Sequence, residues 1–393
     1  MPLHDLNEFL RLSSNLNYNL SAASLNRYNI LMFILGKKQL HENPETDKVQ
    51  KSIAMETLGY LLKAYSEKKR RLGPDAVIHP LRSAALFCIA NKNVRLPNLL
   101  VQLFHDVLED IQSRDFSSQK WRELEEELFR IFDRLEPEEE AVLREKLLYL
   151  TRLRHEQYYE YIGRLLSGAR KYPDLVAVKL TDRLDNTLDM RIGDHDPLEG
   201  VNFFQEIFQL LFVNSFTGHI PEDHQMIPLT LNAARRMYQL FKNAVLLSLI
   251  RQKYPDADSE ESAPSNLFNA VAKASLLEAQ RIFIKTIGYH LTDVSKQREL
   301  LIDAMEYCYS GKTELVTEPG GDRILDGLFT TYFAISSKTE RKQKLDSLYS
   351  DKPLMLEASV AFTVIFFSFL NSPDFFVQGV STEGIEPALN GGR

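Results

Sequence analysis

Apolar residues recur at spacings of three and four along most of the chain, and the strict alternation that marks a β-strand is scarce. Leu3–Leu40 and Met55–Glu67 both show this spacing, and Pro80 and Pro97 stand where the first turn of a helix tolerates proline. Helices of this kind must cover one another's apolar faces to form a core. The pattern therefore predicts an all-α protein.

Composition narrows the class of protein further. The 393 residues are 44% hydrophobic and 26% charged, which is typical of a globular protein, and the net charge of −7 gives no general attraction for nucleic acid. Two cysteines, Cys88 and Cys308, exclude a disulfide framework and a cysteine-based zinc cluster. The apolar run Ala358–Leu370 is shorter than the about 20 residues that span a bilayer, and Met1–Glu8 does not resemble a signal peptide. We expect a cytoplasmic protein with no nucleic-acid or membrane partner.

The helical pattern divides into four regions. Residues 1–49 are expected to form helices that pack on a central helical domain over residues 50–195. A second helical region of unassigned role covers residues 196–380, and residues 381–393 form a polar, glycine-containing tail. An aromatic stripe within residues 362–369 is typical of a core or a dimer interface, so a homo-oligomer remains open.

The run from Phe104 to Asp110 places four polar groups in an apolar helix predicted over Pro97–Ile111. On a helix, His105, Asp106, Glu109 and Asp110 would fall within an arc of roughly 140°. A buried carboxylate must be paired with a cation or bind a metal. A divalent cation would satisfy several of these groups at once.

A second polar stripe lies on a helix predicted over Leu175–Arg191. Its members share the i, i+3, i+4, i+7 spacing and are Asp182, Asp185, Asn186 and Asp189. A solvated acidic face opposite leucines is the ordinary interpretation of such a stripe. The flanking Lys179 and Arg183 favour a functional one, because three carboxylates on one face repel each other unless cations stand opposite them.

Two imidazoles and two carboxylates would make a mixed nitrogen and oxygen ligand set. His79 and His105 would supply nitrogen, and Asp106 and Asp182 would supply oxygen. Such a set suits Mn²⁺, Fe²⁺ or Zn²⁺ and is too rich in nitrogen for Mg²⁺ or Ca²⁺. A bound cation of this kind lowers the pKa of water and polarises phosphorus, and nearby carboxylates can move the proton of that water.

The order of these residues along the chain, a histidine, then a His-Asp pair, then an aspartate, resembles that of the HD superfamily of metal-dependent phosphohydrolases. The fuller pattern is closest to the hydrolase domain of RelA/SpoT-type alarmone enzymes and their small stand-alone relatives. The resemblance covers residues 70–191. It rests on three stretches, which read Arg70-Arg71-Leu72-Gly73 up to His79-Pro80, then Phe104-His105-Asp106-Val107-Leu108-Glu109-Asp110, then Val178-Lys179-Leu180-Thr181-Asp182-Arg183-Leu184-Asp185-Asn186.

The resemblance implies an HD-type helical bundle and a role for each matched residue. The implied metal ligands are His79, His105, Asp106 and Asp182, with Mn²⁺ as the usual ion, and the implied catalytic pair is Glu109 and Asp110. The residues expected to bind the nucleotide are Arg70, Arg71, Lys179, Arg183 and Asn186.

The implied reaction is removal of the 3′ pyrophosphate from (p)ppGpp. Asp185 and Asp189 depart from the family pattern, and a carboxylate beside a polyphosphate is unfavourable unless a cation intervenes. An HD-type nucleotidase or phosphodiesterase acting on another phosphorylated substrate is the first alternative. A non-catalytic regulator that binds a nucleotide is the second.

Overall fold

The computed structural model describes residues 3–21, 23–66, 68–70, 75–154, 156, 158–189, 233–253 and 263–310, with isolated residues between 337 and 385. The chain separates into two compact units. Unit 1 comprises Met1–Glu156, Tyr161–Asp189 and Lys253–Val271, and unit 2 comprises Gln157–Glu160, Met190–Gln252 and Ala272–Arg393.

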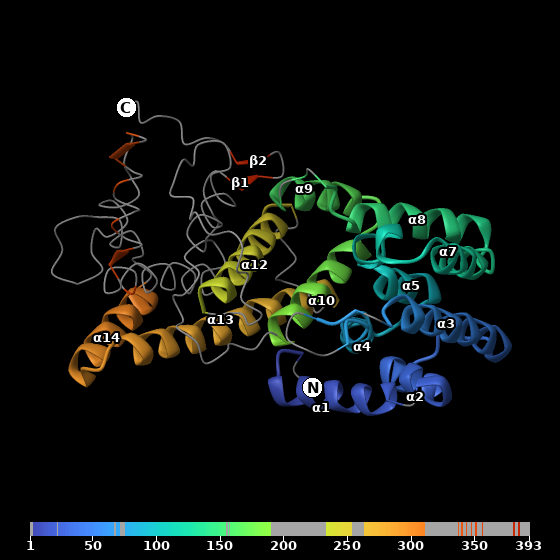
Figure 1. The fold of residues 1–393 in the computed structure, drawn as a ribbon, viewed down its shortest axis with the longest axis horizontal. Coiled ribbons are helices and arrows are strands. Elements are labelled where there is room, and N and C mark those ends of the chain that lie inside the picture. Colours follow the sequence, from blue (N-terminus) through green and yellow to red (C-terminus); the bar gives the residue numbers. More distant parts are fainter. Residues whose placement is uncertain are drawn as a thin grey trace. The chain divides into compact units, whose positions relative to one another are not determined.

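Within the described residues the secondary structure is helical apart from two short strands (Figure 1). The α-helices are α1 (Leu6–Leu20), α2 (Ala23–Leu35), α3 (Pro44–Ala64), α4 (Ile78–Ala90), α5 (Leu96–Phe104), α6 (Val107–Asp110), α7 (Ser118–Phe132), α8 (Pro137–Leu150), α9 (Tyr158–Ala169), α10 (Asp174–Asp189), α12 (Ala233–Lys253), α13 (Ala263–His290) and α14 (Val294–Ser310). The strands β1 (Val380–Ser381) and β2 (Gly384–Ile385) form an antiparallel pair, with Val380 opposite Ile385. The predicted all-α class is confirmed.

Side chains that accept hydrogen bonds define where several of these helices begin. Asp5 caps α1, with Oδ1 2.8 Å from the backbone N of Asn7. Asn43 caps α3 in the same way, and Pro44 occupies the first position of that helix, where its missing N–H has no partner to lose. Pro80 and Pro97, which the sequence predicted in first helical turns, lie in the first turns of α4 and α5.

Helix α4 is the centre of unit 1. All eleven of its residues from Ile78 to Cys88 are buried, and α1, α2, α5 and α10 all pack against it. The exposed fractions of Leu86 and Cys88 are both 0%. A helix that is apolar on every side must be enclosed by other helices. This position brings polar residues at its start into the interior of the unit.

Unit 2 has a polar seam in its interior. The buried Arg236 on α12 donates from Nε to Glu278 Oε1 over 2.9 Å, and Asn243 Nδ2 donates to Ser275 Oγ over 2.8 Å. No described helix is both long enough and apolar enough to cross a membrane. The apolar run over 358–370 lies outside the described residues.

Candidate metal centre

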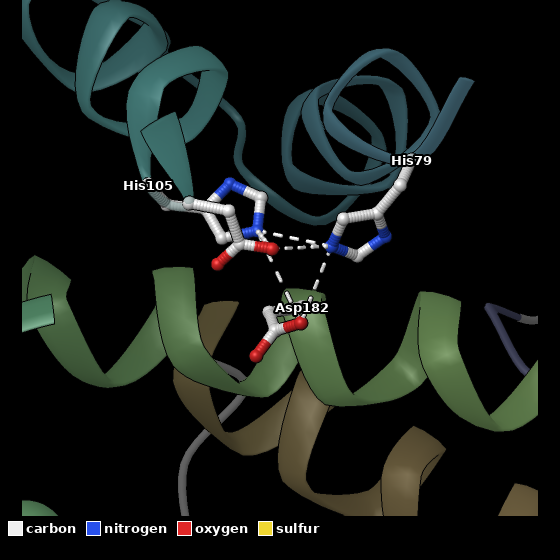
Figure 2. A group of neighbouring side chains, drawn as sticks. His79, His105 and Asp182 are labelled. Carbon is white, nitrogen blue, oxygen red and sulfur yellow. Dashed lines mark hydrogen bonds and ion pairs between the residues drawn. The ribbon is translucent and has the colours of Figure 1, made fainter. Parts of the chain in front are cut away.

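Four side chains from three parts of unit 1 meet at one point. His79 lies near the start of α4, Asp182 lies on α10, and His105 and Asp106 form the turn between α5 and α6. Each offers one ligand atom, and these atoms all lie within 4.8 Å of one another. Figure 2 shows the two imidazole rings directed toward each other above Asp182. The structure thus brings together the four residues that the sequence predicted as metal ligands.

The distances within this cluster are those of groups that share one small space. His79 Nε2 lies 3.1 Å from Asp106 Oδ2 and 3.4 Å from Asp182 Oδ1. It also lies 3.2 Å from His105 Nε2. The exposed fractions are 7% for His79 and 3% for both His105 and Asp182. The side chain of Asp106 is 26% exposed, whereas the buried carboxylate of Asp182 requires a cation or hydrogen-bond donors beside it.

The helix predicted over Pro97–Ile111 is interrupted at the His-Asp pair. Helix α5 ends at Phe104, and α6 begins at Val107. His105 Nδ1 lies 2.7 Å from the backbone O of Gln102, so the imidazole takes up a carbonyl at the end of α5. Asp106 has φ −103° and ψ −2°, outside the range of a regular helix. The side-chain hydrogen bond and this turn aim both ligands toward α10.

Both imidazoles present the nitrogen that a metal needs. His79 Nδ1 is 2.6 Å from Asp185 Oδ2, and His105 Nδ1 is 2.7 Å from the Gln102 carbonyl. An acceptor at Nδ1 keeps the proton there, so in the neutral ring Nε2 carries the free lone pair. Ligating histidines are held in this way by a carboxylate or a carbonyl. This donor set fits a divalent transition metal.

The electrostatics of the cluster are those of a cation site. Burial alone would lower the pKa of His79, but Asp185, Asp106 and Asp182 raise it well above its ordinary value of 6.5. Burial raises the pKa of Asp182, but Lys179 and the two histidines bring it well below 3.8. Without a metal, a proton on His79 supplies the positive charge that the carboxylates require.

The acidic stripe on α10 is not a solvated face. The exposed fraction of Asp185 is 0%, and that of Asp182 is 3%. Lys179 Nζ lies 2.7 Å from Asp182 Oδ2 and 5.0 Å from the centre of the Tyr161 ring. Asn186 Nδ2 donates to Asp182 Oδ1 over 2.6 Å. The ordinary interpretation of the stripe is therefore wrong, because cations and amides enclose its carboxylates.

The predicted catalytic pair lies beside the cluster on α6. Glu109 accepts a hydrogen bond from the backbone N of Arg152, and Asp110 Oδ2 accepts one of 3.1 Å from the Tyr65 hydroxyl. The pKa of Asp110 is raised, chiefly by burial and then by the nearby charge of Asp106. Burial and Asp106 also raise the pKa of Glu109. Carboxyl groups shifted toward neutrality are suited to exchange protons.

The residues predicted to bind a nucleotide are placed differently from one another. Arg70 reaches three acceptors on α10, and its side chain is 17% exposed. Its Nη1 lies 3.2 Å from Asp185 Oδ2, its Nη2 2.8 Å from Asn186 Oδ1, and its Nε 3.2 Å from Asp189 Oδ2. Arg183 is buried on α10. Arg71 lies outside the described residues.

Three residues near the cluster were not identified as site residues from the sequence. Arg82 is a buried cation on α4, Asp185 contacts His79, and Tyr65 contacts Asp110. Arg82 carried a signal, because a lone arginine in a helix that is otherwise apolar must find a buried carboxylate. Its two carboxylate partners, Asp185 and Asp189, lie more than 100 positions away in the sequence, and only the tertiary packing shows them.

Comparison with protein-family models, with curated proteins and with solved structures finds no match. The geometry of the side chains therefore carries the functional argument.

Proposed function

We propose that this chain is a metal-dependent phosphohydrolase with an HD-type helical domain and that it acts on a nucleotide pyrophosphate, with (p)ppGpp as the first candidate. One observation carries the proposal. Two buried imidazoles and two carboxylates converge within 4.8 Å, and both imidazoles turn Nε2 toward the cluster. A cluster with this composition suits Mn²⁺, Fe²⁺ or Zn²⁺.

The residues around the cluster support hydrolysis of a phosphate ester. A divalent cation held there would supply the charge that acidifies water and polarises phosphorus. Glu109 and Asp110, whose pKa values burial and Asp106 raise, would take the proton as the oxygen of water forms its bond to phosphorus. The bond from phosphorus to the 3′ oxygen of the ribose breaks, and that oxygen leaves with a proton as a hydroxyl. The products are pyrophosphate and the nucleotide with a free 3′ hydroxyl.

The two carboxylates that depart from the family pattern do not oppose an anionic substrate. Asp189 Oδ2 lies 2.7 Å from Arg82 Nη2, and Asp185 Oδ1 lies 2.8 Å from Arg82 Nε. Arg70 contacts both carboxylates as well. Because these cations offset the two negative charges, the α10 stripe has little charge left to repel phosphate groups.

A second candidate is an HD-type nucleotidase or phosphodiesterase with another phosphorylated substrate. The contacts of Arg70 support this second candidate. Three acceptors on α10 hold its guanidinium, which in the alarmone pattern would contact the nucleotide. Binding a guanine nucleotide through Arg70 would require the exchange of these contacts.

A substrate panel tests the proposal and separates the candidates. The full-length chain, supplied with Mn²⁺, is incubated with ppGpp, pppGpp, nucleoside mono-, di- and triphosphates and a cyclic dinucleotide, and the products are resolved by anion-exchange chromatography. We expect pyrophosphate release from the alarmones, with Asp182→Ala as the inactive control. Turnover of another member alone would favour the second candidate. Tight binding of ppGpp without turnover of any member would indicate a regulator and would refute hydrolysis.

A further inference from the structure

The side of His79 that faces away from the cluster is held by a carboxylate. Figure 2 shows the second ring nitrogen of His79 directed away from His105 and Asp182. That nitrogen, Nδ1, lies 2.6 Å from Asp185 Oδ2. Asp185 follows Asp182 by three positions on α10, so both lie on the same face of the helix. One helix thus supplies a carboxylate to each nitrogen of the same ring, since Asp182 Oδ1 is 3.4 Å from Nε2.

Asp185 could not remain ionised at this depth without a cation. Its exposed fraction is 0%, and a buried carboxylate without a partner is strongly destabilising. Arg82 supplies the charge, with Nε 2.8 Å from Asp185 Oδ1 and Nη2 3.1 Å from Asp185 Oδ2. A guanidinium that binds both oxygens fixes the plane of the carboxylate as well as its charge. The oxygen that faces His79 is therefore fixed in place.

Arg82 is itself held from three sides. Asp189 Oδ1 accepts a hydrogen bond from Arg82 Nη1 over 2.8 Å, and Asp189 Oδ2 lies 2.7 Å from Arg82 Nη2. From α1, Ser13 Oγ accepts from Nη1 over 3.3 Å, and the ring of Phe9 lies 4.7 Å from the guanidinium carbon. The exposed fraction of Arg82 is only 2%. Helix α1 thus contacts the metal cluster indirectly, through Arg82 and then Asp185.

We propose that Asp185 is a positioning residue that fixes the tautomer and the orientation of His79, and that Arg82 fixes Asp185 for this task. The inference deepens the proposed function, because it rests on metal binding by His79. It assigns the residues 82 and 185 a role that the motif pattern does not give them. It also gives distinct roles to the two carboxylates that α10 carries three positions apart, since Asp182 and Asp185 contact different nitrogens of one imidazole.

Two isosteric variants of α10 distinguish a specific effect of Asp185 on His79 from a general loss of charge near Arg82. Asp185→Asn removes the charge that faces His79. Asp189→Asn removes the charge of the other carboxylate that Arg82 contacts, which does not touch His79. The dissociation constant for Mn²⁺ is measured by calorimetry on the full-length chain, after circular dichroism has shown that each variant is folded. We expect an increase of about 10- to 100-fold for Asp185→Asn and less than about threefold for Asp189→Asn. Equal effects of the two variants, or a constant for Asp185→Asn within about threefold of the unmutated chain, would overturn the proposal.

A measurement on the unmutated chain keeps the proposal testable should Asp185→Asn fail to fold. Long-range ¹⁵N–¹H spectra of the histidine-labelled protein, without metal and with diamagnetic Zn²⁺, report which ring nitrogen carries the proton, and His79→Gln assigns the signal. We expect an exchange-protected Nδ1 proton on His79 in both states. A proton on Nε2 alone in the metal-free chain at high pH would contradict the role of Asp185. Failure of the unmutated chain to bind Mn²⁺ would instead refute the proposed function, while the spectrum without metal would still test the contact with Asp185.

Discussion

Metal binding by this chain should release a proton from His79, so the apparent affinity for Mn²⁺ should rise with pH. In the metal-free chain the carboxylates of Asp185, Asp106 and Asp182 raise the pKa of His79 well above 6.5, against the opposite effect of burial. The experiment therefore varies pH and measures the affinity for Mn²⁺. A metal can take the lone pair of Nε2 only after the proton on that nitrogen has left.

The size of the effect follows from the number of protons displaced. The pKa values of Asp106 and Asp182 lie below 3.8, so at neutral pH both residues are already ionised and release none. His79 contributes about one proton, which makes the association constant rise about tenfold per pH unit until pH reaches the raised pKa of His79.

The same shift fixes the sign of the stability change in the metal-free chain. Because the folded pKa of His79 is above its ordinary value of 6.5, the protonated ring contributes stability that is fully present below pH 6.5. That contribution is lost as pH rises through the raised pKa. The lowered pKa of Asp182 has the opposite sign, so its contribution is present above pH 3.8 and is lost as pH falls through the lowered value.

Calorimetric titration with Mn²⁺ in two buffers that differ in ionisation enthalpy counts the released protons directly. We expect about one proton per metal ion at about pH 6.5, and an affinity that increases roughly tenfold from about pH 6 to about pH 7. Asp189→Asn is the matched control. Its affinity for Mn²⁺ should rise with pH as steeply as that of the unmutated chain, because the substitution leaves the contacts of His79 in place. Zero proton release together with a flat affinity over this range would refute the charge balance inferred for the cluster.

Three further predictions concern the groups around the cluster and the core behind it. Glu109→Gln should keep the metal content and lower single-turnover hydrolysis by about 10²- to 10⁴-fold, and an unchanged rate would exclude Glu109 from proton transfer. Tyr65→Phe removes a hydrogen bond that lowers the pKa of Asp110, so the acidic limb of the pH–rate profile should move to higher pH; a shift to lower pH would contradict that contact. Phe104→Ala empties a site that is 0% exposed and lies edge-on against two aromatic rings, which should reduce the free energy of unfolding by about 3–5 kcal/mol in urea. A loss below about 1 kcal/mol would show that the core collapses into the space.

The helices could be predicted because their signals are local, whereas the four clustered residues were predicted from the resemblance of their motifs to those of the HD superfamily. The period of the apolar residues and the positions of proline indicate the helices. The positions 182, 185, 186 and 189 share a face in any α-helix, so their common side of α10 required no tertiary information. Burial of that face was the part that the pattern alone could not decide, since a solvated acidic stripe has the same spacing.

The rest depends on contacts between distant segments. The interruption of the helix at His105 arises because its imidazole takes the Gln102 carbonyl, a choice that the apolar spacing does not encode. The pairing of Arg82 with Asp185 and Asp189 depends on how α4 packs on α10. The division into regions 1–49, 50–195, 196–380 and 381–393 stays a prediction, as does the formation of a homo-oligomer. The nucleotide contacts predicted for Arg70, Arg71, Lys179, Arg183 and Asn186 are also untested.

We propose that four side chains of unit 1, His79, His105, Asp106 and Asp182, hold one divalent metal ion. Metal analysis of the purified full-length chain by plasma mass spectrometry, after equilibration with Mn²⁺ and removal of free ion, tests it most directly. We predict about one ion per chain, and its loss in both His105→Ala and Asp182→Ala, because each variant removes one of the ligand atoms that lie within 4.8 Å of one another. Full metal content in both variants, or none in the unmutated chain, would refute metal binding by these four residues.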